Sequence, residues 1–172
     1  SARTAGFNAL DIGALTHESW ALHYFLMFIG GGSAGTAGGV KVGTVAILAL
    51  LVIAEIRGRA DTEAFGRRVG SSAQRQAITV LVLGSAMVVL GTLVILRDTD
   101  IPTDQVIFEV ISAFGTVGLS TGITADLPET SQLMLTLLMY VGRVGTITLA
   151  ASLALGEHRM PYRYPEEHPI VG

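Results

Sequence analysis

The sequence predicts an all-α polytopic membrane protein, and three observations support this fold class. Half of the 172 residues are hydrophobic, only 15% are charged, and the mean hydropathy is +0.57. The apolar residues form long uninterrupted runs instead of the short periodic stretches of a water-soluble fold. One run, residues 77–96, contains no charge and has the roughly 20 residues that a helix needs to cross a bilayer.

The composition also excludes several classes of function. A net charge of -3 and a pI near 5.7 provide no basic surface for nucleic acid. The absence of cysteine excludes disulfides, thiolate metal sites and cysteine nucleophiles.

Residues 19–54 form an apolar region with a break at its centre. The region is too long for one membrane crossing and too short for two. Residues 30–39 read GGGSAGTAGG, a composition that does not favour a continuous helix. We therefore expect one crossing that is interrupted midway.

The placement of arginines orients the predicted helices. Residues 57–75 are rich in arginine and the opposite connections are not, so the positive-inside rule puts this loop in the cytoplasm. The helix over residues 77–96 then runs outward, and the apolar segment 131–155 runs back inward. The arginines of the loop are Arg57, Arg59, Arg67, Arg68 and Arg75.

Residues 103–122 are too short to span and must leave and re-enter the membrane on the outer side, as a re-entrant pore loop does. We expect a short helix over residues 104–114, followed by the non-helical sequence GTVGLSTG. A helix carboxyl end carries partial negative charge, and the carbonyl oxygens that follow it can replace the hydration shell of a cation. Gly118 would permit the backbone angles required. The alternative is a surface turn after an amphipathic helix.

The pore-loop pattern occurs twice in the chain. The sequence TAGFN at residues 4–8 matches TVGLS at residues 116–120 in its order of residue types. The same spacing separates Gly30 from Gly142, and each of these glycines interrupts an apolar crossing. Tandem pore-loop units explain both correspondences.

Taken in order, these motifs resemble the Trk/Ktr/HKT superfamily of potassium transporters. The resemblance covers nearly the whole chain, and in that family four repeats of helix, pore loop and helix, like those of potassium channels, surround one ion pathway. It implies that this chain is a C-terminal part of the pore-forming subunit, with part of repeat three and all of repeat four. The matching segments are RTAGFN at residues 3–8, residues 30–41, FE at 108–109, residues 112–122, GRVG at 142–145 and YRYPEE at 162–167.

The resemblance divides the chain into four parts. Residues 1–56 would be the filter loop and broken inner helix of repeat three, and residues 57–76 the arginine-rich cytoplasmic loop. Residues 77–156 would be the complete repeat four, and residues 157–172 a cytoplasmic tail.

The resemblance also implies the residues of a potassium site. Two walls of a selectivity filter would bind the ion through backbone carbonyls, and the glycine-rich break would be an intramembrane gating loop below them. The first wall is Thr4, Ala5, Gly6 and Phe7, and the second is Thr116, Val117, Gly118 and Leu119. The gating loop would contain Gly30, Gly31, Gly32, Ser33, Gly35, Gly38, Gly39 and Lys41.

Arg143 resembles an arginine that the family places in the last inner helix, facing the pathway near the gating loop. A guanidinium in a narrow cavity repels potassium, and it can also bond loop carbonyls and hold the gate shut. The alternative is a structural arginine paired with a buried carboxylate such as Glu109. Lys41 has two readings as well, a gating contact or a side chain that reaches the cytoplasmic interface.

The implied function is potassium uptake across the bacterial inner membrane, with potassium as transported ligand, no covalent cofactor and no enzymatic activity. The implied partners are the lipid bilayer, a second full-length subunit in a homodimer, and a cytoplasmic nucleotide-binding regulatory subunit. Because only two of four filter walls are visible, a sodium-permeable or sodium-coupled transporter of the same fold stays open.

Two rival classes explain less of the sequence. Gly30, Gly32 and Gly35 satisfy G-x-G-x-x-G, the fingerprint of a nucleotide-binding enzyme, but that fold needs a strand before the glycines. A membrane scaffold without transport activity would explain the apolar runs, yet it leaves the repeated loops and Arg143 without a purpose.

Overall fold

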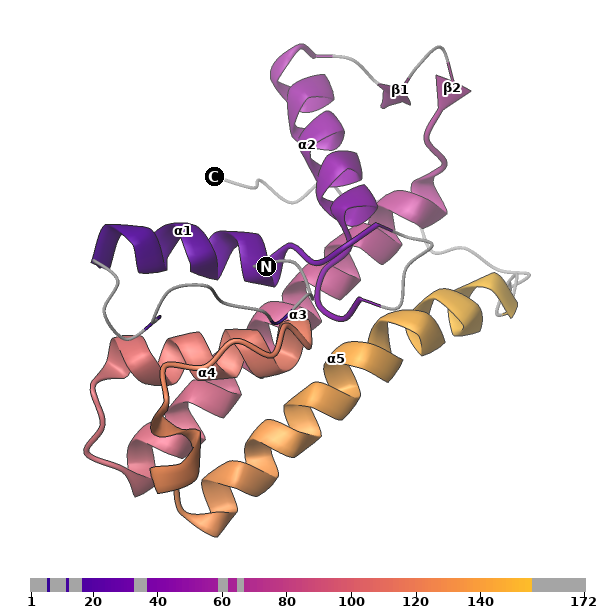
Figure 1. Ribbon diagram of the computed structural model, residues 1–172. Coiled ribbons are helices and arrows are strands. Elements are labelled where there is room, and N and C mark those ends of the chain that lie inside the picture. The colour runs from indigo at the N-terminus through magenta and orange to yellow at the C-terminus, as the bar shows by residue number, and fades with distance from the viewer. Residues whose placement is uncertain are drawn as a thin grey trace.

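The computed structural model describes residues 6, 12, 17–32, 37–58, 62–64 and 67–155. This part of the chain is mostly helical, which confirms the predicted all-α class (Figure 1). A two-residue antiparallel hairpin lies between the second and third helices. The elements are α1 His17–Phe28, α2 Val42–Ile56, β1 Glu63–Ala64, β2 Arg67–Arg68, α3 Ser71–Asp98, α4 Thr103–Gly115, the 3-10 helix η2 Ile123–Asp126 and α5 Glu129–Leu155.

The longest helix, α3, contains the uncharged run over residues 77–96 and extends it at both ends. It begins at Ser71, so the polar residues 71–76, expected in a loop, form its first turns. Within the described residues, α3 is the one helix long and apolar enough to cross a bilayer. The second predicted span, residues 131–155, is helical as part of α5.

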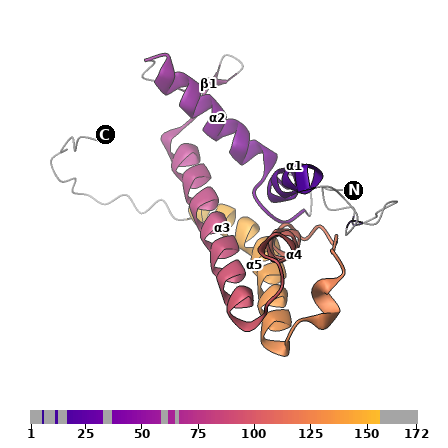
Figure 2. The same ribbon diagram turned by 90° about the vertical axis from the view of Figure 1, so that its left-hand side faces the viewer.

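The predicted break in the apolar region of residues 19–54 is present. Helix α1 ends at Phe28 and α2 begins at Val42, and the two helices are not collinear (Figures 1 and 2). The positions between them belong to a glycine-rich segment, which has low helix propensity. We call residues 29–41 the glycine break.

Helix α4 is the central element. It packs against α1, α3 and α5, and Figure 2 shows α1 on one side of it and α3 and α5 on others. All its residues from Phe108 to Gly115 are buried. With 13 residues it extends roughly 20 Å, too short for a bilayer core of about 30 Å.

Apolar side chains of α4 join three clusters that hold the helices together. Val106 and Val110 pack with Ile95 of α3 and Leu138 of α5. Aromatic rings join α1 to α4, since Phe108 lies 6.2 Å from Trp20 and 6.0 Å from Tyr24 between ring centroids. The Tyr24 hydroxyl also donates to the carbonyl of Asp104, at 2.9 Å. These contacts fix the short helix at the centre of the molecule, where its carboxyl end meets the glycine break.

Candidate ion-conduction site

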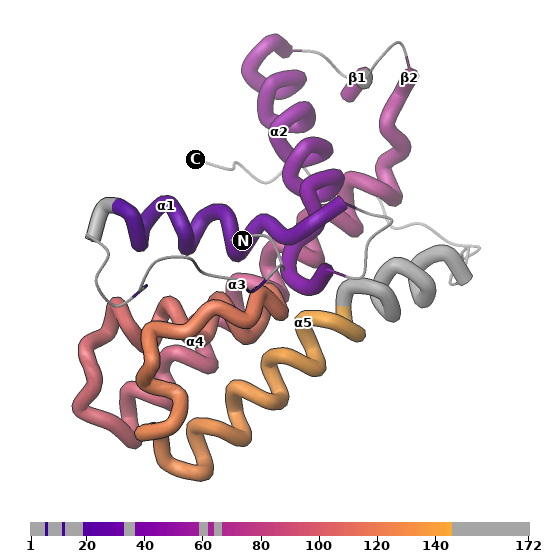
Figure 3. Tube along the Cα trace, in the orientation of Figure 1, coloured from indigo at the N-terminus to yellow at the C-terminus, as the bar shows by residue number. Residues whose placement is uncertain are grey.

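The second predicted filter wall follows α4 directly and folds back along it. The helix ends with Thr116 in the left-handed conformation, φ 50°, and the N–H of Val117 donates to Ser112 O at 2.9 Å. Further on, the Ser112 hydroxyl donates to Leu119 O at 2.5 Å. The chain therefore reverses at Thr116 and runs beside the helix, as the tube in Figure 3 shows.

Side chains and backbone of this wall face different ways. Val117 is 2% exposed and Leu119 3% exposed, and both pack into the apolar cluster around Phe108. Gly118 between them is exposed and has φ 85°. The Leu119 carbonyl accepts from the Ser112 hydroxyl and is thereby directed toward α4.

The glycines of the two predicted walls lie side by side. Gly6 has φ 66°, and a Cβ placed on it would lie 2.9 Å from Val117 O. A Cβ on Gly118 would lie 3.6 Å from the Cα of Gly6. Both glycines have a left-handed backbone, which favours glycine, and at Gly6 the Val117 carbonyl also lies too close for a side chain. The other residues of the first wall, Thr4, Ala5 and Phe7, lie outside the described residues.

The two described flanks of the glycine break, residues 29–32 and 37–41, bond to each other. Ile29 and Val40 form a parallel bridge, with Gly30 N–H donating to Val40 O at 2.8 Å. The N–H of Val42 donates to Gly31 O at 3.3 Å. Such internal bonds satisfy backbone groups where water is scarce. Ser33 and Gly35 of the predicted gating loop lie outside the described residues.

This loop contacts both the end of α4 and the middle of α5. The Gly38 N–H donates to the Thr116 side-chain oxygen at 3.0 Å. The Gly39 N–H donates to Gly142 O in α5 at 3.3 Å. The glycine break is thereby joined to the residue that begins the second predicted filter wall and to the neighbour of Arg143.

The glycines related by the internal repeat both lie at close backbone contacts. A Cβ on Gly30 would lie 2.1 Å from Gly38 O, and one on Gly142 would lie 1.9 Å from Phe114 O. Neither site has room for a side chain. At Gly30 the close atom belongs to the same loop, whereas at Gly142 it belongs to another helix, α4.

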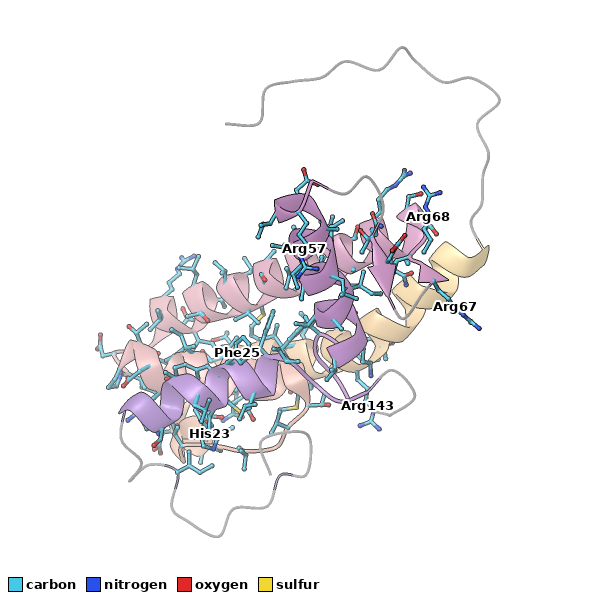
Figure 4. All side chains as sticks on the ribbon, turned by 90° about the horizontal axis from the view of Figure 1, so that it is seen from above. His23, Phe25, Arg57, Arg67, Arg68 and Arg143 are labelled. Atoms are coloured by element: carbon cyan, nitrogen blue, oxygen red, sulfur yellow. The ribbon has the colours of Figure 1, made fainter. Side chains whose placement is uncertain are left out.

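Arg143 projects from α5 and is exposed (Figure 4). It lines a cavity of about 510 Å³ together with Thr116, Gly118 and Glu109. The carboxylate of Glu109 bonds to residues after the filter wall and not to Arg143, so the alternative of a buried ion pair between them is not observed. Lys41 donates a hydrogen bond to the carbonyl of Ala37, within the glycine break.

Three arginines of the predicted cytoplasmic loop lie at or near the β1–β2 hairpin and the end of α2. Arg57 follows α2, while Arg67 and Arg68 form β2, and all three are exposed. Figure 4 shows Arg67 and Arg68 at the hairpin and Arg57 beside α2, away from His23 of α1.

The nucleotide-binding alternative lacks its structural context. Gly30 and Gly32 follow helix α1, whereas the dinucleotide fingerprint follows a strand and opens a helix. The third glycine of that motif, Gly35, lies outside the described residues.

Sequence reasoning assigned no role to the hydrogen bonds that hold the filter loop. Glu109 entered it only as a possible partner for Arg143 and as part of the family motif. A signal was present, because a carboxylate among apolar residues needs donors, and three hydroxyl residues follow the loop. These are Ser120, Thr121 and Thr124.

The molecule combines a short buried helix, a loop with glycine in the left-handed conformation, a broken apolar helix and a long apolar helix. This combination is typical of a membrane transport protein with a re-entrant segment. Comparison with known proteins identifies the family: residues 1–158 match TrkH, described as a cation transport protein. The chain belongs to this family.

Several curated relatives match over nearly all of the chain. It is 39% identical to the potassium/sodium uptake protein NtpJ of Enterococcus hirae, over 99% of its length. It is 37% and 35% identical to the Ktr system potassium uptake proteins B of Bacillus subtilis and Vibrio alginolyticus, over 99% and 100% of its length. The chain spans 38–39% of the length of these relatives. The resemblance to Trk and Ktr transporters is confirmed.

Proposed function

We propose that the protein to which this chain belongs takes up potassium across a membrane, through a filter of backbone carbonyls. The observation that carries the proposal is the juxtaposition of Gly6 and Gly118. Two loops of matching sequence, far apart in the chain, meet at their glycines in left-handed conformations. Carbonyl groups from adjacent loops are the ligands that replace the hydration shell of potassium in a filter.

In this proposal the two walls are residues 4–7 and 116–119, and two further repeats supply the others. The side chains of Val117 and Leu119 pack into the core and hold the second wall, leaving the exposed backbone at Gly118 to face the ion. The carboxyl end of α4 carries partial negative charge and favours a cation nearby.

The glycine break acts as the gate. Its Gly38 and Gly39 hydrogen bonds to Thr116 and Gly142 keep it against the carboxyl end of α4, where it obstructs the path below the filter. Only one hydrogen bond joins the glycine break to each of these two partners, and the break consists of small residues. The break can therefore move aside at modest cost. Arg143 adds positive charge beside this path and raises the barrier for cations.

The proposed setting is the bacterial inner membrane, with a multi-pass subunit made of four pore-loop repeats. This chain would supply part of repeat three and all of repeat four. We further propose a homodimer of full-length subunits and a cytoplasmic nucleotide-binding regulatory subunit. The names of two relatives, as proteins B of a Ktr system, support a multi-component arrangement.

A second candidate function is potassium uptake with sodium permeation or sodium coupling. The observation in its favour is the relative from Enterococcus hirae, which is named a potassium/sodium uptake protein. Both candidates use the same filter, and they differ in how strongly sodium competes.

The test uses the complete subunit, with any regulatory subunit it requires, in a bacterium that lacks potassium uptake. We expect growth at low potassium and rubidium uptake that potassium inhibits. An excess of sodium distinguishes the two candidates, because inhibition or stimulation by sodium indicates permeation or coupling. Well-inserted protein that gives neither growth nor uptake would contradict both.

A further inference from the structure

Glu109 is a carboxylate in an otherwise apolar, buried part of α4. It is 5% exposed, and its chain neighbours Phe108 and Val110 are fully buried. Removing a carboxylate from water is costly unless hydrogen-bond donors replace the water. A residue of this kind at the centre of the molecule therefore requires specific partners.

Those partners all belong to the segment that follows the second filter wall. The Oε1 atom accepts from the Ser120 hydroxyl at 2.6 Å, and from the N–H and hydroxyl of Thr121 at 2.8 and 3.1 Å. The Oε2 atom accepts from the Thr124 hydroxyl at 3.1 Å. Four donors from three residues thus converge on one carboxylate.

Ser112 completes this arrangement. It lies three positions after Glu109, hence on the same face of α4, and its hydroxyl donates to Leu119 O at 2.5 Å. The two side chains hold consecutive parts of the returning loop, Leu119 by its carbonyl and residues 120–124 by their donors. The carboxylate is occupied by the loop, which argues against a role as a direct ligand of a passing cation.

We propose that Glu109 is a positioning residue that fixes the outer end of the filter wall formed by residues 116–119. This inference rests on the proposed function and goes beyond it, because it assigns the geometry of the wall to a side chain that does not touch the ion. Gly118 has no side chain to anchor it, so its position depends on anchors on both sides. On the inner side, the anchors are the hydrogen bonds at the carboxyl end of α4. On the outer side, they are Ser112 and Glu109.

The first test is Glu109→Gln in the complete subunit. Glutamine keeps the size of the side chain but replaces one accepting oxygen by an NH₂ group, which cannot accept from the loop. We expect the preference for potassium over sodium to fall about tenfold or more, the change that losing one hydrogen bond to a charged group produces. The readout is inhibition of rubidium uptake by each cation, normalised to the amount of protein in the membrane.

Glu129→Gln is the matched control, since Glu129 is an exposed glutamate at the start of α5. It should leave both ion preference and uptake unchanged. A fall in uptake with unchanged preference in Glu109→Gln would indicate a general structural role and would overturn the proposal.

A second pair of variants keeps the Glu109 carboxylate. One variant removes a hydroxyl that donates to it, and the other removes the hydroxyl of the second anchor, Ser112. Thr124→Val deletes one hydroxyl at nearly constant shape, and Ser112→Ala deletes the bond to Leu119. We expect each to lower potassium preference in the same direction as Glu109→Gln and by a smaller factor. If Thr124→Val and Ser112→Ala both keep the wild-type preference for potassium, tethering of the loop is contradicted. This holds even where Glu109→Gln fails to insert or acts through its lost charge. If the wild-type subunit itself shows no rubidium uptake, that result counts instead against the proposed function.

Discussion

The N–H of Gly39 donates a hydrogen bond of 3.3 Å to the carbonyl oxygen of Gly142, joining the glycine break to the middle of α5. The bond is made where α5 also crosses the end of α4, because Gly142 has no side chain to separate the helices. One position therefore unites three elements: the break, the carboxyl end of the short helix and the helix that carries Arg143.

Replacing Gly142 by alanine should destabilise the protein. The new Cβ would lie 1.9 Å from Phe114 O, so α4 and α5 must move apart. Overpacking of this kind costs about 1–3 kcal/mol. We expect a lower melting temperature of the detergent-solubilised subunit, measured by size-exclusion chromatography after heating.

Gly145→Ala is the matched control on the same helix. The nearest heavy atom to its Cβ would be Cγ1 of Val141, on the same helix, at 3.5 Å. This is an ordinary contact, so the melting temperature should stay near that of wild type. Equal stability of the two variants would contradict the close crossing at Gly142.

Thr116→Val should make the proposed gate easier to open. The substitution removes the hydroxyl that accepts from the Gly38 N–H and keeps the branched shape of the side chain. Loss of a neutral hydrogen bond costs about 1 kcal/mol, which corresponds to a roughly fivefold increase in the open population. Potassium influx at saturating concentration measures this increase.

The control for this variant is Thr136→Val on α5, whose hydroxyl bonds only within its own helix, to Gln132 O at 3.0 Å. Influx through Thr136→Val should match wild type. If Thr116→Val also matches wild type, the bond to Gly38 does not hold the gate.

Arg143→Ala should increase potassium flux, because it removes a positive charge from the wall of the 510 Å³ cavity beside Thr116 and Gly118. A barrier lowered by about 1 kcal/mol raises a rate roughly fivefold. Rubidium uptake per inserted subunit is the measurement, with Arg97→Ala, an exposed arginine at the end of α3, as control. Unaltered flux in Arg143→Ala would remove the support for a barrier role.

The helices could be predicted where proline or glycine residues mark their ends in the sequence. Residues 104–114 were expected to form a short helix, and α4 spans Thr103–Gly115, because Pro102 precedes it and a glycine-rich loop follows. The first turns of α3 were missed, since residues 71–76 are polar and a hydropathy argument ends where the apolar run ends. A helix that continues into water beyond its membrane segment leaves no hydrophobic signal.

The candidate site was predictable only as far as repeats and local propensities reach. The correspondence of Gly30 with Gly142 followed from spacing, but the requirement at each depends on a partner carbonyl elsewhere in the chain. The tether at Glu109 depends on the reversal at Thr116, which brings residues 120–124 back beside α4. Contacts of this kind depend on tertiary structure and cannot be read from one segment.

Gly118→Ser tests the central claim most directly. In the complete subunit, a side chain at φ 85° strains the backbone whose carbonyls we propose as potassium ligands. The measurement is the ratio of potassium to sodium inhibition of rubidium uptake. Gly58→Ser is the control, because Gly58 has φ 62° with open space around it, away from the filter. The account predicts a fall in potassium preference of about tenfold in Gly118→Ser and none in Gly58→Ser. Unchanged preference in well-inserted Gly118→Ser would contradict the filter.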